Sequence, residues 1–140
     1  MKEKNPFNLD VVSVRLVKDA PIMSGHPITK PEDAVLLLGK HLCEMDREVL
    51  CVINMKTDGT PINCHFASIG CLNESMAHPR EIFKASILSN AATIMLMHNH
   101  PSGNLTPSKH DTMMTDRMES FYGSSSIQAY IVVFGIYVKL

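Results

Sequence analysis

The sequence predicts a mixed α+β fold, an α/β architecture in which one mixed β-sheet is flanked by helices. Three observations support this prediction. Short apolar runs of strand length alternate with segments that repeat apolar residues at helical spacing. Asp58-Gly59 is a strong hairpin signal between two of those runs. The 140 residues, with 45% hydrophobic and 19% charged side chains, also suit one globular domain without repeats.

The expected order is strand, helix, hairpin, helix, strand, helix, strand. We expect a polar leader at residues 1–10, followed by one domain at residues 11–140. The predicted strands lie at 11–17, 48–55, 62–69, 92–97 and 127–138, and the predicted helices at 31–45, 79–89 and 107–122.

Local signals justify these elements in turn. Alternation in Val11 to Val17 favours a strand near a sheet edge. Pro31, followed by acidic residues, favours a helix start, because proline fits the first turn and carboxylates suit the positive end of the helix dipole. Pro79 begins the second helix and Asn90 ends it. The β-branched residues after Ile127 favour a last strand or a bent pair of strands.

Composition restricts the classes of function. The formal net charge of -1 supplies no broad basic field, so direct nucleic-acid binding is not expected. No apolar run approaches the roughly 20 residues of a membrane-spanning helix, and the start lacks a signal-peptide core. We therefore expect a cytoplasmic protein with no membrane partner. The four cysteines form no Cys-x-x-Cys pair and are expected to be reduced and buried.

The most informative stretch runs from Ala91 to Asp111. Its apolar beginning has the length of a strand buried on both faces. If that strand continues to His100, its period of two places His98 and His100 on the same side. Thr106-Pro107 then reads as a helix start, which puts Asp111 just over one turn inside the helix and near Ser108.

Two imidazoles and a carboxylate, from His98, His100 and Asp111, form a ligand set that suits Zn²⁺. Three protein ligands leave one tetrahedral position open for water, as in catalytic zinc sites. Taken singly, each part has a simpler explanation: His-x-His is common, and Ser108-x-x-Asp111 is also a capping-box pattern. Together they are harder to explain as packing, so the residues favour a hydrolytic metal site.

The pattern His98-x-His100-Pro101-x6-Ser108-x2-Asp111 resembles the signature of the JAB/MPN (JAMM) metalloprotease superfamily. The wider text, from His78-Pro79-Arg80-Glu81 through the metal motif, is similar to its bacterial RadC-like branch, and the resemblance covers roughly Val11 to Met118. It implies a JAB/MPN-like domain with a cytidine-deaminase-like sandwich. It also implies that the two histidines and Asp111 are zinc ligands and that Ser108 helps to hold the tetrahedral intermediate.

Hydrolysis by zinc-activated water also needs a group that takes a proton from the water and delivers it to the leaving nitrogen. The acidic candidates are Glu44, Glu48, Glu74 and Glu81, and periodicity does not choose among them. In the resembling superfamily this glutamate opens the strand after the first long helix. Glu48 holds that place here, so the resemblance implies that Glu48 is the general acid/base.

The expected function is that of a zinc-dependent metallohydrolase that cleaves peptide or isopeptide bonds in a peptide or protein substrate. Two other classes remain open: a metal-binding interaction module without turnover, and a DNA-repair-associated accessory protein. Asn99 and Ser102 could touch substrate or simply stabilise the turn. Where the family's last strand usually carries an Asp-His pair, this chain has Gln128-Ala129-Tyr130. Apolar edges such as 11–17 could pair with a second copy, so a homo-oligomer is also open.

Overall fold

The fold is a mixed α+β domain, seen in a computed structural model that describes residues 9–19, 21–22, 25–69, 79–100, 109, 112–113, 116 and 128–131. The elements within these residues are α1 (Pro31–Cys43), β1 (Val49–Met55), β2 (Pro61–Ile69), α2 (Pro79–Leu88), β3 (Thr93–His98) and β4 (Gln128–Ile131). Their order and type agree with the prediction for both helices, the hairpin and the strand that carries the histidines.

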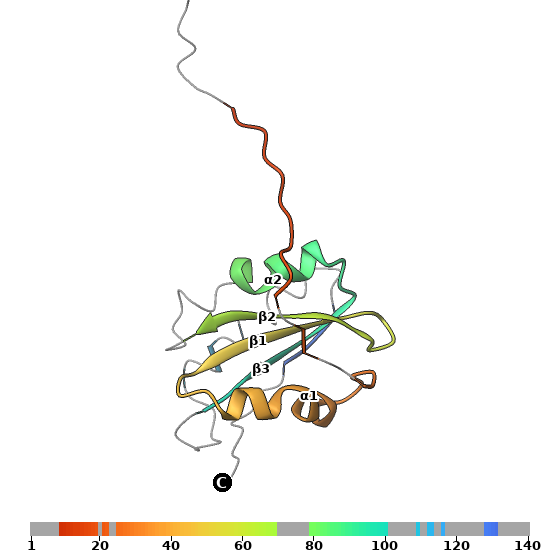
Figure 1. The fold of residues 1–140 in the computed structure, drawn as a ribbon, viewed down its shortest axis with the longest axis vertical. Helices are drawn as coiled ribbons and strands as arrows, with labels where there is room; N and C mark the ends of the chain where they lie inside the picture. The colour runs from red at the N-terminus through yellow and green to blue at the C-terminus, as the bar shows by residue number, and fades with distance from the viewer. Residues whose placement is uncertain are drawn as a thin grey trace, which may run out of the picture.

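The four strands form one mixed sheet in the order β2-β1-β3-β4. β1 pairs antiparallel with both β2 and β3, whereas β4 runs parallel to β3. In Figure 1, α2 covers one face of this sheet and α1 covers the other. The prediction of a single α+β domain with helices on a mixed sheet is therefore confirmed.

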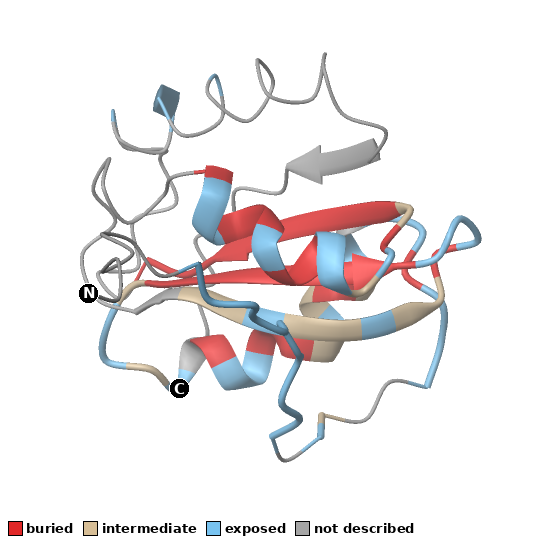
Figure 2. Ribbon diagram, turned by 90° about the horizontal axis from the view of Figure 1, so that it is seen from above, coloured by how far each residue is buried: buried red, intermediate tan, exposed pale blue. Residues whose placement is uncertain are grey.

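The core lies in two layers, because alternate residues of a strand face opposite sides of a sheet. All seven residues of β1 are buried, and β1 and β3 stand out as the buried centre of Figure 2. The layer under α1 contains Ile28, Ala34, Leu38, Leu42, Val49, Cys51, Ile53, Met55, Met95 and Met97. The layer under α2 contains Leu50, Val52, Ile82, Phe83, Ala91, Ile94 and Leu96. A strand with helices on both faces accounts for the continuous apolar runs in the sequence.

The ends of the elements follow their local chemistry. Pro31 is the first residue of α1, and the Asp33 carboxylate reaches back to the backbone N–H groups of Thr29 and Lys30 at 3.0 and 3.2 Å. After α2, Asn90 adopts a positive φ of 52°, a conformation that asparagine tolerates at helix ends. In the β1–β2 hairpin, Gly59 has a φ of 86°, as the Asp-Gly signal predicts.

The prediction of a strand at 11–17 is wrong. No strand is assigned within residues 9–19, and Figure 1 shows this segment running away from the sheet. Val11 and Val17 are 99% and 87% exposed. Alternation favours a strand only where a neighbouring strand supplies hydrogen bonds, and the sheet pairings seen in the described residues involve β1 to β4 alone.

Two further predictions are met in part. The sequence indicates a strand from Ala92 to Met97 and leaves its continuation to His100 open, whereas β3 runs from Thr93 to His98. Most of the predicted helix at 107–122 lies outside the described residues, and those that are described there, at 109, 112–113 and 116, are helical. Within the described residues, no helix combines the length and apolarity needed to cross a membrane.

Candidate metal centre

The candidate site lies where β3 ends. His98 is the last residue of β3 and is 1% exposed, and His100 follows two residues later and is 7% exposed. Their Nε2 atoms are 2.9 Å apart, and the ring centroids are 4.8 Å apart with the planes tilted by 51°. The sequence therefore predicted correctly that the two imidazoles share one side of the chain.

The spacing of the two nitrogens can be compared with the geometry of zinc. Zn–N bonds of about 2.0–2.1 Å at tetrahedral angles hold two ligand nitrogens about 3.3–3.4 Å apart. At 2.9 Å, the Nε2 atoms lie at hydrogen-bond distance, and they need to separate by only about 0.4–0.5 Å to bind one ion. The donor chemistry and the convergence of these histidines therefore fit two ligands of a zinc site.

The sheet determines where the histidines face. His98 lies directly opposite Leu50 in the β1–β3 ladder, and such pairs carry their side chains on the same face. Leu50 belongs to the core layer under α2, so His98 continues that layer at its end. A buried imidazole pair at the end of an apolar layer places polar donors where water is scarce, which strengthens any interaction with a bound cation.

Glu48 is brought to the same end of the sheet. Leu50 pairs with His98, and the Val49 backbone N–H donates to the side chain of Asn99 at 2.7 Å. The β1–β3 ladder ends at Leu50 and His98, and Glu48 lies two residues before Leu50 at this end of the sheet. Glu48 also shares its strand parity with Leu50, which corresponds to the histidine side of the sheet. Glu48 is half-buried.

The other acidic candidates for the general acid/base differ from Glu48 in their position. Glu44 is the exposed C-cap residue of α1. Glu81, on α2, is exposed and forms an ion pair with Lys84 at 3.2 Å. Glu74 lies outside the described residues. Among the described candidates, Glu48 alone directly precedes the β1 residues that pair with the histidine strand.

Three of the predicted site residues, Ser102, Ser108 and Asp111, lie outside the described residues. The ligand role of Asp111 and the oxyanion role of Ser108 thus stay predictions. Within the residues that the structure describes, no group of three or more histidine, cysteine or acidic side chains is placed to hold a metal ion. The described part of the candidate centre is the histidine pair, and the role of Glu48 stays a prediction as well.

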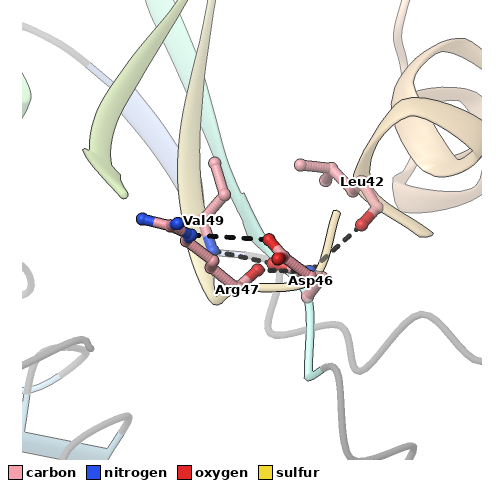
Figure 3. Close-up of polar contacts among 5 residues, drawn as sticks. Leu42, Asp46, Arg47 and Val49 are labelled. Carbon is pink, nitrogen blue, oxygen red and sulfur yellow. Dashed lines mark hydrogen bonds and ion pairs between the residues drawn. The ribbon is translucent and has the colours of Figure 1, made fainter. Parts of the chain in front are cut away.

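Asn99 has a contact set that the sequence did not indicate. It is 2% exposed, and its side-chain nitrogen donates to the carbonyl oxygens of Leu42 and Arg47 at 3.0 and 2.9 Å. Figure 3 shows these contacts around the connection between α1 and β1. Of the two roles left open for Asn99, the structure favours stabilisation of the chain, but of the preceding connection rather than of its own turn. The only sequence signal for the burial of Asn99 was the continuous apolar run that precedes it.

A pair of thiols lies in the core layer under α1, on the face of the sheet opposite to His98 and Leu50. Cys51 of β1 is buried and Cys64 of β2 is half-buried, and both are free thiols. The hydrogen bond from the Cys51 thiol lowers the pKa of Cys64 to about 7, against the opposing effect of burial. The same hydrogen bond, together with burial, raises the pKa of Cys51. The two thiols therefore differ in reactivity.

Comparison with known proteins places these features in a family. A family model described as the RadC-like JAB domain matches residues 28–131. A UPF0758 protein from Clostridium acetobutylicum is 39% identical over 116 residues, which cover 81% of this chain and 51% of that protein. A UPF0758 protein from Moorella thermoacetica is 43% identical over 96 residues, covering 69% of this chain and 42% of its own length.

A more distant relative, a UPF0758 protein from the archaeon Methanosarcina acetivorans, is 33% identical over 116 residues, covering 81% of this chain and 51% of its own length. The chain spans about half the length of the curated relatives it matches first. The matched residues include the histidine strand and the segment that carries Glu48.

Proposed function

Because this chain belongs to the RadC-like JAB domain family, we propose that it is a zinc-dependent hydrolase of the JAMM type that cleaves peptide or isopeptide bonds. The observation that carries the proposal is the approach of two buried imidazole nitrogens, His98 Nε2 and His100 Nε2, to 2.9 Å. Imidazole nitrogens are preferred zinc ligands, and two that converge in a buried place supply part of the donor set of a zinc site.

Each residue has one role in the proposal. His98, His100 and Asp111 hold the ion, which when bound supplies a Lewis acid that polarises a carbonyl and acidifies water. Glu48 accepts the proton of the attacking water and delivers it to the leaving nitrogen. The Ser108 hydroxyl donates a hydrogen bond to the oxyanion that develops on the substrate. A peptide or protein is the substrate class, because an amide leaving group requires such proton delivery.

The structure supports the choice of Glu48 through its position. A general base must come within hydrogen-bond reach of the water from which it takes a proton. Glu48 lies one residue before β1, two residues from Leu50, which pairs with His98, and is half-buried. Glu44, on the same connection, is exposed at the end of α1. The pair therefore offers a test with a matched control.

The first experiment measures metal content by elemental analysis of protein purified without a chelator or a polyhistidine tag. We expect about one zinc per chain in the wild type and a sharp reduction in Asp111→Ala. The second experiment screens peptide and isopeptide substrates. We expect Glu48→Gln to keep its zinc and lose turnover by about 100-fold or more, whereas Glu44→Gln keeps both.

The outcomes separate the three classes of function. Absence of zinc in the wild type after reconstitution overturns the proposal. Bound zinc with no turnover on any substrate favours a metal-binding interaction module. A salt-dependent affinity for DNA that is indifferent to Glu48→Gln and Asp111→Ala favours a nucleic-acid accessory protein.

A further inference from the structure

The side chain between the two histidines is a clamp on the segment that carries Glu48. Asn99 Oδ1 accepts a hydrogen bond from the Val49 N–H at 2.7 Å. Asn99 Nδ2 donates to the carbonyl oxygens of Leu42 at 3.0 Å and Arg47 at 2.9 Å. Figure 3 shows that these partners come from the end of α1, from the connection and from the start of β1. One amide thus ties together three points of the preceding chain.

These contacts use the amide nearly to capacity. A primary amide offers two N–H donors and one oxygen with two lone pairs, and both donors and one lone pair are engaged here. No other side chain of this size combines donors for two carbonyls with an acceptor for one N–H. Since Asn99 is 2% exposed, water does not replace these bonds easily, and the partners depend on the amide.

The partners flank Glu48 on both sides. Arg47 directly precedes Glu48 and Val49 directly follows it, and each is hydrogen-bonded through its backbone to Asn99. The contact lies just beyond Leu50 and His98, the pair that closes the β1–β3 ladder at this end. The Asn99 side chain therefore keeps β1 hydrogen-bonded to the chain after β3 where the ladder stops, next to Glu48.

The ion pair of the connection supplies little restraint of its own. It joins Arg47 Nε and Asp46 Oδ1 at 3.4 Å, between side chains that are 67% and 88% exposed. Pairs exposed to this degree contribute little to order. The buried hydrogen bonds of Asn99 are therefore the stronger restraint on the backbone that leads into Glu48.

We propose that Asn99 is a positioning residue, which holds the main chain on both sides of Glu48 beside the His98–His100 pair. The inference rests on the proposed function in one respect: the held carboxylate matters for turnover only if Glu48 is the general base. The clamp itself concerns the chain alone and can be measured without metal or substrate.

The test uses Asn99→Asp in the full chain. Aspartate has nearly the shape of asparagine and keeps an oxygen for the Val49 N–H, but it sets a second oxygen against the Leu42 and Arg47 carbonyls. The matched control is Asn63→Asp on β2. Asn63 also uses its amide in an internal network, with Asn54 at 2.6 Å and Ser89 at 2.8 Å, away from the connection.

The first readout is amide hydrogen exchange in the protein without metal, at a temperature where both variants are folded. We expect exchange at residues 44–49 to rise by about tenfold or more in Asn99→Asp, because local opening becomes easier, and to stay unchanged in Asn63→Asp. Unchanged exchange at these residues in Asn99→Asp overturns the clamp.

The second readout is steady-state kinetics of the zinc-loaded protein. We expect Asn99→Asp to lower kcat by about 10- to 100-fold while KM and zinc content stay close to wild type, because a displaced base slows the reaction more than it weakens binding. Asn63→Asp should keep its kcat. Faster exchange with an unchanged kcat overturns the positioning role. A zinc-loaded wild type without turnover refutes the proposed function instead, and hydrogen exchange then decides the clamp by itself.

Discussion

The hairpin residue Gly59 offers the sharpest test of the fold. Its φ of 86° lies in the region that residues with a Cβ rarely adopt. A Cβ added here would overlap the carbonyl oxygen of Ile28 and stand 3.0 Å from the Ile28 carbonyl carbon, and these are backbone atoms that cannot rotate away. Gly59→Ala therefore combines backbone strain with a steric overlap.

The cost of Gly59→Ala can be built from its parts. The left-handed conformation costs an alanine about 1–2 kcal/mol. Relief of the overlap moves the Ile28 backbone, whose N–H donates to the Gly59 carbonyl at 2.7 Å, and loss of that bond costs about 1 kcal/mol. Ile28 is 3% exposed in the core layer under α1, so its movement also disturbs packing. The expected loss in the free energy of unfolding is about 2–4 kcal/mol.

Urea unfolding followed by far-UV circular dichroism measures this loss, and thermal unfolding should show a decrease of about 7–14 °C in Tm. Gly25→Ala is the matched control, because a Cβ at Gly25 meets no atom within 4 Å. It should change the free energy of unfolding by less than about 0.5 kcal/mol. Equal effects of the two substitutions would refute the reasoning from the hairpin geometry.

Two further predictions follow from perturbed pKa values. The rate at which iodoacetamide labels Cys64 should rise with pH with a midpoint near its pKa of about 7. Cys51→Ala removes the thiol donor and should move that midpoint toward 9.0. Peptide-resolved mass spectrometry measures both midpoints, and an unmoved midpoint in Cys51→Ala would contradict the assigned cause. Hydrogen bonds from the backbone N–H and the hydroxyl of Thr29, and from the backbone N–H of Lys30, lower the pKa of Asp33 from 3.8. Because the folded pKa is the lower one, this carboxylate stabilises the fold above pH 3.8 and loses that effect as the pH falls through its folded value. Asp33→Asn should lack this part of the pH dependence in urea unfolding, and parallel profiles would count against it.

The candidate site was predictable from the sequence to the extent that its signals are local. His98 and His100 are two residues apart at the end of β3, so their proximity depends on a short stretch of sequence. The choice of Glu48 was different, because it depended on a resemblance to a family. The structure adds a physical reason, since antiparallel pairing of β1 with β3 brings a residue 50 positions away to the same sheet end.

The contacts of Asn99 had no sequence signal that could identify them. Its partners are 50, 52 and 57 residues earlier in the chain, and they are backbone groups whose side chains could be almost any residue. A pattern in the amino-acid sequence does not mark a backbone acceptor. Only the folded chain shows why an amide between the two histidines serves the segment that carries Glu48.

The sequence by itself determined the helices, the Asp-Gly hairpin, the buried central strands and the histidine pair. Each depends on residues within one short window, through proline and glycine geometry, apolar periodicity or spacing. Tertiary structure decided which strands are neighbours, and therefore left 11–17 without a place in the sheet although its alternation favours a strand. It also decided what holds Glu48. The strand order and the restraint on Glu48 both depend on hydrogen bonds between distant segments. The free energy of these hydrogen bonds is gained only when the whole chain has folded.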